Sequence, residues 1–189
     1  MSDQEMKWKL LSSEYVFDDR WLRARKDTCE KPDGSIVKNY YVIEYMEWVT
    51  ALCITEDLKV VMVKQYRHAL GDVCLELPGG CVDDSDASFD AAVKRETLEE
   101  TGYEFDKLTY LGDTSPNPST NTNRMHMYLL EGGRKVQEQQ LDPNEQIEIV
   151  VLTIPELLDK LRKNEIIQSM HVTTIFYALQ HLGVLKMVM

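Results

Sequence analysis

Three carboxylates lie close together in one short segment, Arg95-Glu96-Thr97-Leu98-Glu99-Glu100-Thr101-Gly102. Glu96 and Glu100 are four residues apart and share one face of a helix, and Glu99 borders that face. The helix macrodipole disfavours anions in the last turns, at a cost of about 0.3–1 kcal/mol each. A divalent cation would offset the repulsion, and Mg²⁺ prefers carboxylate oxygens together with substrate phosphates. The alternative is a solvated acidic face that tolerates this cost.

A helix from about Ser88 to Thr101 must carry these carboxylates, with Ser85 or Asp86 as its N-cap and Gly102 as its left-handed terminator. Turn residues and β-rich runs predict short strands on both sides of it. These runs are Trp21–Arg25, Ile36–Tyr45, Val49–Thr55, Val60–Gln65, part of Leu70–Val82, Leu108–Asp113, Arg124–Leu130 and Ile147–Leu152.

Two further helices are expected near the C-terminus. One begins at Pro155, where Thr153 and Glu156 have capping-box spacing, and the other covers about Val172–Leu182. The order of the elements along the chain predicts an α+β, or mixed α/β, fold: strands come first, then one internal helix, more strands and finally helices. We expect residues 1–45 to form a small N-terminal antiparallel sheet and residues 46–189 to form the main domain.

The composition limits the function classes. The chain has 189 residues, 43% of them hydrophobic, and 21 Lys+Arg against 32 Asp+Glu give a net charge of −11. This charge disfavours nucleic acid and anionic membranes as partners, and no run approaches the ~20 apolar residues of a membrane helix. The polar N-terminus predicts no secretory signal, and the four cysteines are expected as thiols. We therefore expect a cytoplasmic protein.

The carboxylate segment resembles the signature of the Nudix hydrolases, a glycine, five residues, Glu, seven residues and then R-E-U-x-E-E-x-G-U, where U is bulky and apolar. The matching residues are Arg95, Glu96, Glu99, Glu100 and Gly102, with Glu76-Leu77-Pro78-Gly79-Gly80 upstream. The resemblance implies a Nudix fold, a mixed sheet between helices. It also implies that Glu96, Glu99, Glu100 and the Gly79 carbonyl hold Mg²⁺, or Mn²⁺ in its place, with Arg95 at the catalytic centre.

One position departs from the signature. Gly80 is followed after five residues by Asp86 instead of Glu, and eight residues instead of seven separate Asp86 from Arg95. The loop is therefore one residue longer, with Asp86 as the substitute partner of Arg95. Whether Asp86 pairs with Arg95 is left open by the spacing.

Other motifs resemble the branch of ADP-ribose pyrophosphatases and related nucleotide-sugar hydrolases. Gln65-Tyr66-Arg67 matches its Q-[FY]-R motif, which implies that Arg67 contacts the diphosphate, and we place Glu76 with it at the substrate. Ser115-Pro116-Asn117-Pro118-Ser119 resembles its S-P-G-x-S loop, although Asn117 replaces the glycine.

The loop Asp142-Pro143-Asn144-Glu145 resembles the acidic loop that carries the catalytic base in this branch. The matching residue is Glu145, with Glu148 as the alternative and Glu99 as the next candidate. A solvated acidic loop is the competing interpretation.

Trp21 and Tyr40 are candidates for stacking the nucleobase, although packing explains most strand aromatics. In relatives such aromatics come from both subunits, so the resemblance implies a homodimer. The predicted reaction is Mg²⁺-dependent hydrolysis of the pyrophosphate bond of ADP-ribose or a related nucleotide sugar, giving a nucleoside monophosphate and a sugar phosphate. GDP-mannose, ADP-glucose and dinucleotide polyphosphates are alternative substrates, and a catalytically silent ligand sensor is the alternative outside enzymes.

Overall fold

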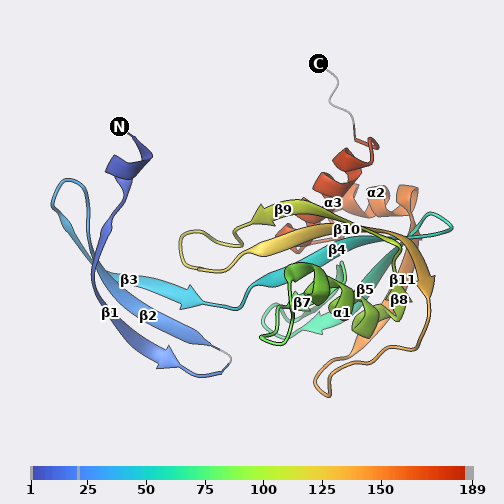
Figure 1. Cartoon of the computed structure of the whole chain (residues 1–189), viewed down its shortest axis with the longest axis horizontal. Coiled ribbons are helices and arrows are strands. Elements are labelled where there is room, and N and C mark those ends of the chain that lie inside the picture. Colours follow the sequence, from blue (N-terminus) through green and yellow to red (C-terminus); the bar gives the residue numbers. More distant parts are fainter. Residues whose placement is uncertain (1, 21, 186–189) are drawn as a thin grey trace. The chain divides into compact units, whose positions relative to one another are not determined.

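The computed structural model describes residues 2–20 and 22–185, and the chain divides into two compact units (Figure 1). The first unit is the chain up to Met46 together with Ser115–Arg124. The second unit is Glu47–Thr114 together with the chain from Met125 onward.

The first unit contains an antiparallel three-stranded sheet in the order β1-β2-β3, which confirms the predicted small N-terminal sheet. Its elements are the 3₁₀ turn η1 (Asp3–Met6), β1 (Lys9–Asp18), β2 (Arg23–Glu30) and β3 (Ile36–Glu44). The prediction for Trp21–Arg25 was wrong in extent, because the strand there continues to Glu30, and Trp21 lies outside the described residues. The sequence did not predict β1, since every residue of this strand is exposed and no apolar alternation marks it.

The second unit is built on a mixed sheet with the central order β11-β5-β4-β10-β8, in which β10 runs parallel to β4. Three further strands pair with interior strands of this order, β6 with β5, β7 with β4 and β9 with β10. The bounds are β4 (Trp48–Thr55), β5 (Lys59–Arg67), β6 (Asp72–Glu76), β7 (Gly79–Cys81), β8 (Tyr103–Glu104), β9 (Lys107–Thr114), β10 (Met125–Lys135) and β11 (Ile147–Thr153).

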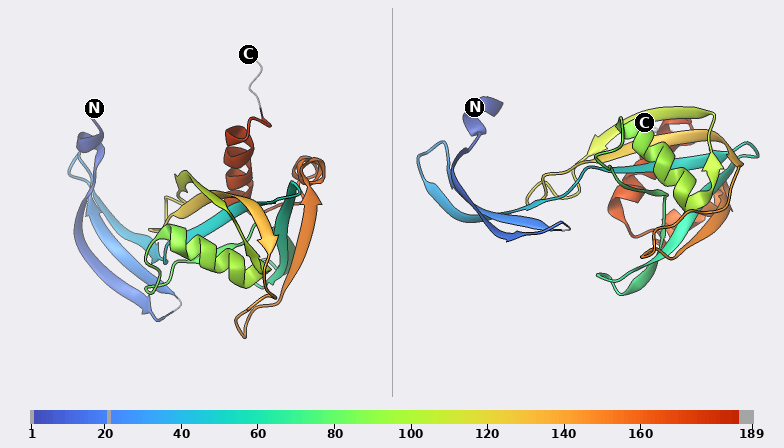
Figure 2. Two further views of the ribbon diagram at one scale, coloured as in Figure 1. Left: turned by 45° about the vertical axis from the view of Figure 1, so that its right-hand side comes forward. Right: turned by 60° about the horizontal axis from the view of Figure 1, so that its bottom comes forward.

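Helices cover both faces of this sheet (Figure 2). On one face, α1 (Phe89–Thr101) packs through Ala92 and Val93 against a cluster that includes Val49 and Tyr128. On the other, α2 (Ile154–Arg162) and α3 (Ser169–His181) pack against the largest apolar cluster. This arrangement confirms the predicted α+β architecture with a sheet between helices. Within the described part of the chain, no helix is long and apolar enough to cross a membrane.

The helix ends test the capping predictions. Gly102 terminates α1 with φ of 73°, and Thr153 and Glu156 form the expected capping box of α2. The predicted N-cap of α1 was wrong, because Ser88 caps this helix by accepting a hydrogen bond from the Ala91 N–H (3.2 Å). The last helix begins at Ser169, three residues before its predicted start.

Candidate active site

Two glutamates of α1, Glu96 and Glu100, face the glycine turn that precedes the helix. Glu100 is 4% exposed, and its Oε2 accepts a hydrogen bond from the Gly79 N–H at 2.9 Å. A Cβ atom on Gly80 would lie 2.7 Å from the Glu96 carboxylate, so only glycine fits this close approach without displacement. Gly79 has φ of 148°, and a Cβ atom there would lie 2.2 Å from the Val49 carbonyl oxygen. The two glycines therefore bring main chain and carboxylates together.

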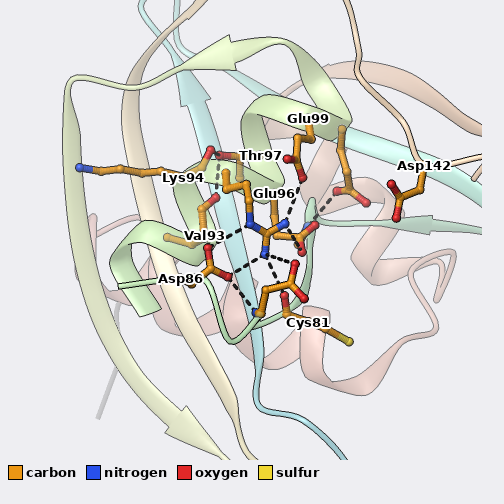
Figure 3. A network of polar contacts seen from close by, with 12 residues as sticks. Cys81, Asp86, Val93, Lys94, Glu96, Thr97, Glu99 and Asp142 are labelled. Carbon is orange, nitrogen blue, oxygen red and sulfur yellow. Dashed lines mark hydrogen bonds and ion pairs between the residues drawn. The ribbon is translucent and has the colours of Figure 1, made fainter. Parts of the chain in front are cut away.

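The guanidinium of Arg95 joins the loop to the helix through Asp86 and Glu99, which Figure 3 labels. Its Nε donates to Asp86 Oδ1 at 3.0 Å and its Nη2 to Asp86 Oδ2 at 2.8 Å. Nη2 also donates to the Cys81 carbonyl (3.1 Å), while Nη1 donates to Glu96 Oε1 and Glu99 Oε2, both at 3.0 Å. Asp86 therefore pairs with Arg95 despite the longer loop, which answers the question that the spacing left open.

Burial changes the protonation of two of these carboxylates. Desolvation raises the pKa of Glu96 to about 7, against the lowering effect of Arg95. Desolvation likewise raises the pKa of Glu100 to about 8, against the hydrogen bond from Gly79. The negative charge of Glu145 contributes to both increases, so this loop residue is close enough to Glu96 and Glu100 to repel their carboxylates. Burial therefore favours the neutral form of both side chains, and a bound cation would favour their charged form.

The chemistry of this donor set fits a hard divalent cation, because its ligands are desolvated carboxylate oxygens. As they stand, no three Asp, Glu, His or Cys side chains among residues 2–20 and 22–185 converge closely enough to hold an ion. Arg95 Nη1 bridges Glu96 and Glu99, and the Gly79 N–H contacts Glu100.

A second ion pair joins the ends of β5 and β6. Arg67 Nε donates to Glu76 Oε1 at 3.0 Å and Nη2 to Glu76 Oε2 at 2.5 Å, while Gln65 Nε2 lies 3.3 Å from the same Oε2. Glu76 is 1% exposed, whereas the Arg67 side chain is 47% exposed. The buried Glu76 carboxylate therefore holds one side of the Arg67 guanidinium, while part of the Arg67 side chain is open to solvent.

The first two candidates for the base lie in different surroundings. Glu145 closes a β-turn, in which its N–H donates to the Asp142 carbonyl (2.9 Å) and its Oε2 accepts from the Asp142 N–H (3.0 Å). Glu148 lies within β11, where it pairs with Lys64 of β5.

The candidates for stacking the nucleobase belong to the first unit. Tyr40 of β3 donates its hydroxyl hydrogen to the Ser119 carbonyl at 2.8 Å, and its ring meets Trp8 edge-on at 6.0 Å between centroids. The structure gives no position for Trp21. Trp8 is 46% exposed and was missed by the sequence analysis, although an exposed Trp beside a strand could have drawn attention to it.

His171 was also missed. Its Nδ1 accepts a hydrogen bond from the Leu77 N–H at 3.2 Å, just before the Pro78-Gly79-Gly80 turn. Burial lowers the pKa of His171 to about 4, so the ring is neutral and α3 supports the turn through it. No sequence spacing links residues 77 and 171.

Two family models match this chain. The model of the NUDIX domain matches residues 46–170, and the model described as the nucleoside diphosphate sugar hydrolase N-terminal domain matches residues 8–43. The chain is 29% identical over 170 residues to the methanol dehydrogenase activator of Bacillus methanolicus, covering 89% of this chain and 91% of the relative. It is 27% identical over 175 residues to the ADP-ribose pyrophosphatase of Bacillus subtilis (strain 168), covering 92% and 91%.

A solved structure described as an ADP compounds hydrolase shares the fold, with a TM-score of 0.83 at 21% identity over 95% of this chain and 96% of that chain. The matched NUDIX region includes α1 with its glutamates and the glycine turn that faces them. The resemblance in the sequence is thereby confirmed: the chain belongs to the NUDIX family and is a Nudix hydrolase.

Proposed function

We propose that this enzyme hydrolyses the pyrophosphate bond of ADP-ribose or a related nucleotide sugar, giving a nucleoside monophosphate and a sugar phosphate. The observation that carries this proposal is the pair of desolvated carboxylates, Glu96 and Glu100, that face the Gly79-Gly80 turn. The similarity to an ADP-ribose pyrophosphatase over nearly the whole chain supports the substrate class.

Glu96, Glu99 and Glu100, with the Gly79 carbonyl, would hold Mg²⁺ or, in its place, Mn²⁺. When bound, such an ion supplies positive charge for the diphosphate and lowers the pKa of a bound water. Arg95 orients Glu96 and Glu99 from the side of the loop, because its Nη1 contacts both carboxylates.

Arg67 would bind the diphosphate. Glu76 uses the Nε and Nη2 atoms of the guanidinium, so the Nη1 edge of Arg67 points away from this pair. A guanidinium held by a buried carboxylate is oriented before the substrate arrives, and its fork matches two phosphate oxygens. We therefore assign Glu76 to the substrate site as the residue that orients Arg67.

Glu145 would accept a proton from the attacking water. Its carboxylate is held by its own turn, and its charge already acts on Glu96 and Glu100. Glu148 and Glu99 are the alternative bases. A general base must lie within hydrogen-bond reach of the water or act through one further water.

The first unit would bind the nucleobase and a second copy of the chain. Tyr40 with Trp8, and Trp21 as the sequence suggests, are the aromatic candidates for the base. The β1 strand exposes large apolar side chains that a partner subunit would cover, namely Leu10, Leu11, Tyr15, Val16 and Phe17. We propose a homodimer on this ground, and light scattering on the purified chain tests it. The four free thiols are consistent with the proposed cytoplasmic location.

A substrate panel tests the proposed reaction. ADP-ribose, ADP-glucose, GDP-mannose and dinucleotide polyphosphates are incubated with the enzyme and Mg²⁺, and the products are identified by mass. Release of AMP and ribose phosphate from ADP-ribose, lost in Glu100→Gln and with a chelator, is the expected result. Substrate binding without product in every reaction would contradict the proposal and favour a ligand sensor.

A further inference from the structure

The chain before β11 lies along the carbonyl end of α1. The Gln140 N–H donates to the Glu99 carbonyl at 2.8 Å, and the Gln137 N–H contacts the Gly102 carbonyl at 3.3 Å. A Cβ atom on Gly102 would lie 2.1 Å from the Gln137 carbonyl oxygen, so this close approach depends on glycine. The last carbonyls of a helix have no partner within the helix. Residues 136–140 therefore supply partners to the end of the helix that bears the three glutamates.

Gln139 connects this helix end to the next strand. Its Nε2 donates to the Glu100 carbonyl at 2.6 Å and to the Ile147 carbonyl at 3.2 Å. A primary amide nitrogen carries two hydrogens, so one atom can serve both acceptors. Glu100 lies in the last turn of α1, and Ile147 is the first residue of β11. The Gln139 side chain therefore links the end of α1 to the start of β11, two elements that are not joined by strand pairing.

The candidate base lies on the loop between these anchor points. Glu145 is attached to its own turn through Asp142, by a main-chain hydrogen bond of 2.9 Å and a side-chain hydrogen bond of 3.0 Å. Pro143 occupies the second turn position, which its fixed φ favours. The turn is therefore locally ordered, and its location relative to α1 depends on the hydrogen bonds at the two ends of the loop.

We propose that Gln139 is a positioning residue that holds the Glu145 turn in place against the glutamates of α1. The inference rests on the proposed function, in which Glu145 is the base. Gln139 contacts main chain on both elements, and its effect on the reaction passes through Glu145. A base displaced by about 1 Å can lower the rate by roughly 100-fold.

The Gln139→Met variant tests this inference, since it keeps the length of the side chain and removes both donors. The matched control is Gln140→Met, at an exposed neighbour whose contribution is a backbone N–H that the variant keeps. Both variants are made in the wild-type and Glu145→Gln backgrounds, and kcat and KM are measured with ADP-ribose and Mg²⁺. We expect Gln139→Met to lower kcat roughly 10- to 100-fold with little change in KM, and Gln140→Met to behave as wild type. In the Glu145→Gln background, Gln139→Met should cause no further loss.

A readout without turnover accompanies the kinetics. Hydrogen exchange of the metal-free protein should show faster exchange at residues 140–147 in Gln139→Met, while the middle of α1 stays protected, which also shows that the variant folds. Unchanged exchange, a normal kcat, or an equal loss in the Glu145→Gln background would each overturn the inference. A normal kcat in Glu145→Gln alone would refute the base assignment and the Gln139 inference with it. A slow Glu145→Gln beside a normal Gln139→Met would refute the Gln139 inference alone.

Discussion

Asp86 and Arg95 form a two-point ion pair, 3.0 Å and 2.8 Å long, across a loop that is one residue longer than the family signature. The shorter carboxylate still reaches the guanidinium, and the hydrogen bond from Arg95 lowers the pKa of Asp86. Arg95 in turn contacts Glu96 and Glu99, so Asp86 influences the glutamates through one intermediate side chain.

We predict that Asp86→Asn destabilises the protein by about 2 kcal/mol, because a hydrogen-bonded charge partner is lost beside a partly buried guanidinium. The kcat should fall as well, since Arg95 no longer holds Glu96 and Glu99 in place. Chemical denaturation and steady-state kinetics measure the two effects. Asp83→Asn is the control, because Asp83 is 61% exposed and lies 3.8 Å from Arg95 Nη2. Equal effects of the two substitutions would contradict the role of Asp86.

The Glu100→Gln variant should lose most of its activity and gain stability in the metal-free state. An amide is a poor ligand for a hard cation, which explains the loss. Burial raises the pKa of Glu100 to about 8, so above this pH the folded wild type contains a buried charge that Gln removes. Thermal melts with a chelator at pH 6 and pH 9 test this, and the gain should be larger at pH 9. Near-normal turnover at saturating Mg²⁺ would refute the assignment of Glu100 as a metal ligand.

Acid should weaken the contact between α3 and the glycine turn through His171. The pKa of this residue is about 4 in the folded state and near 6.5 when unfolded, so the unfolded state binds more protons between these values. The contribution of His171 to stability is therefore complete above about pH 6.5 and declines as the pH falls toward 4.

The His171→Asn variant isolates this effect, because its amide oxygen can accept from the Leu77 N–H and does not titrate in this range. The difference in melting temperature between wild type and variant should shrink as the pH falls from 7 to 4. A constant difference would show that His171 does not carry the pH dependence.

The parts of the site that were predictable from sequence lie close together in the chain, where helix geometry fixes how neighbouring residues are arranged. Glu96, Glu99 and Glu100 lie within one helix, and Gly102 ends it because a left-handed residue is needed there. The N-cap was predicted wrongly for a physical reason, since the carboxylate of Asp86 is engaged by Arg95 and Ser88 is left to cap the helix. Local rules could not foresee this competition from a side chain nine residues away.

Contacts between distant segments left no signal in the sequence. Gln139 meets the Glu100 carbonyl across 39 residues, and His171 meets the Leu77 N–H across 94. Each uses a backbone partner, so the type of the partner residue gives no hint. The β1 strand escaped prediction because all its residues are exposed, which removes the alternation that identifies a half-buried strand.

Arg67→Lys should raise KM or lower kcat by more than a conservative exchange would. Lys keeps the charge, but it cannot pair with both oxygens of Glu76 while presenting a further N–H edge to a phosphate. Lys64→Gln is the control, since this exposed lysine lies on the same strand. Unchanged kinetics in Arg67→Lys would indicate that Arg67 is a structural surface residue.

The role of Glu145 gives the most demanding prediction. If Glu145 is the base, Glu145→Gln should lower kcat by roughly 10²–10⁴-fold, the usual contribution of general-base catalysis. Substrate affinity should change little, because the carboxylate contacts the attacking water. Its removal also reduces the repulsion that adds to desolvation in raising the pKa of Glu96 and Glu100, so metal binding should not weaken. Rapid-quench kinetics and calorimetric titration of Mg²⁺ measure these effects separately.

Glu148→Gln is the internal control for this prediction, because Glu148 lies three residues further on, within β11 and opposite Lys64. A large loss of kcat in Glu148→Gln, together with normal kinetics in Glu145→Gln, would transfer the role of base to Glu148. Normal kinetics in both variants would exclude the loop and direct attention to Glu99. Among the three glutamates of α1, the side chain of Glu99 is 39% exposed and that of Glu96 14%, while Glu100 is buried, so a water could reach Glu99 most easily.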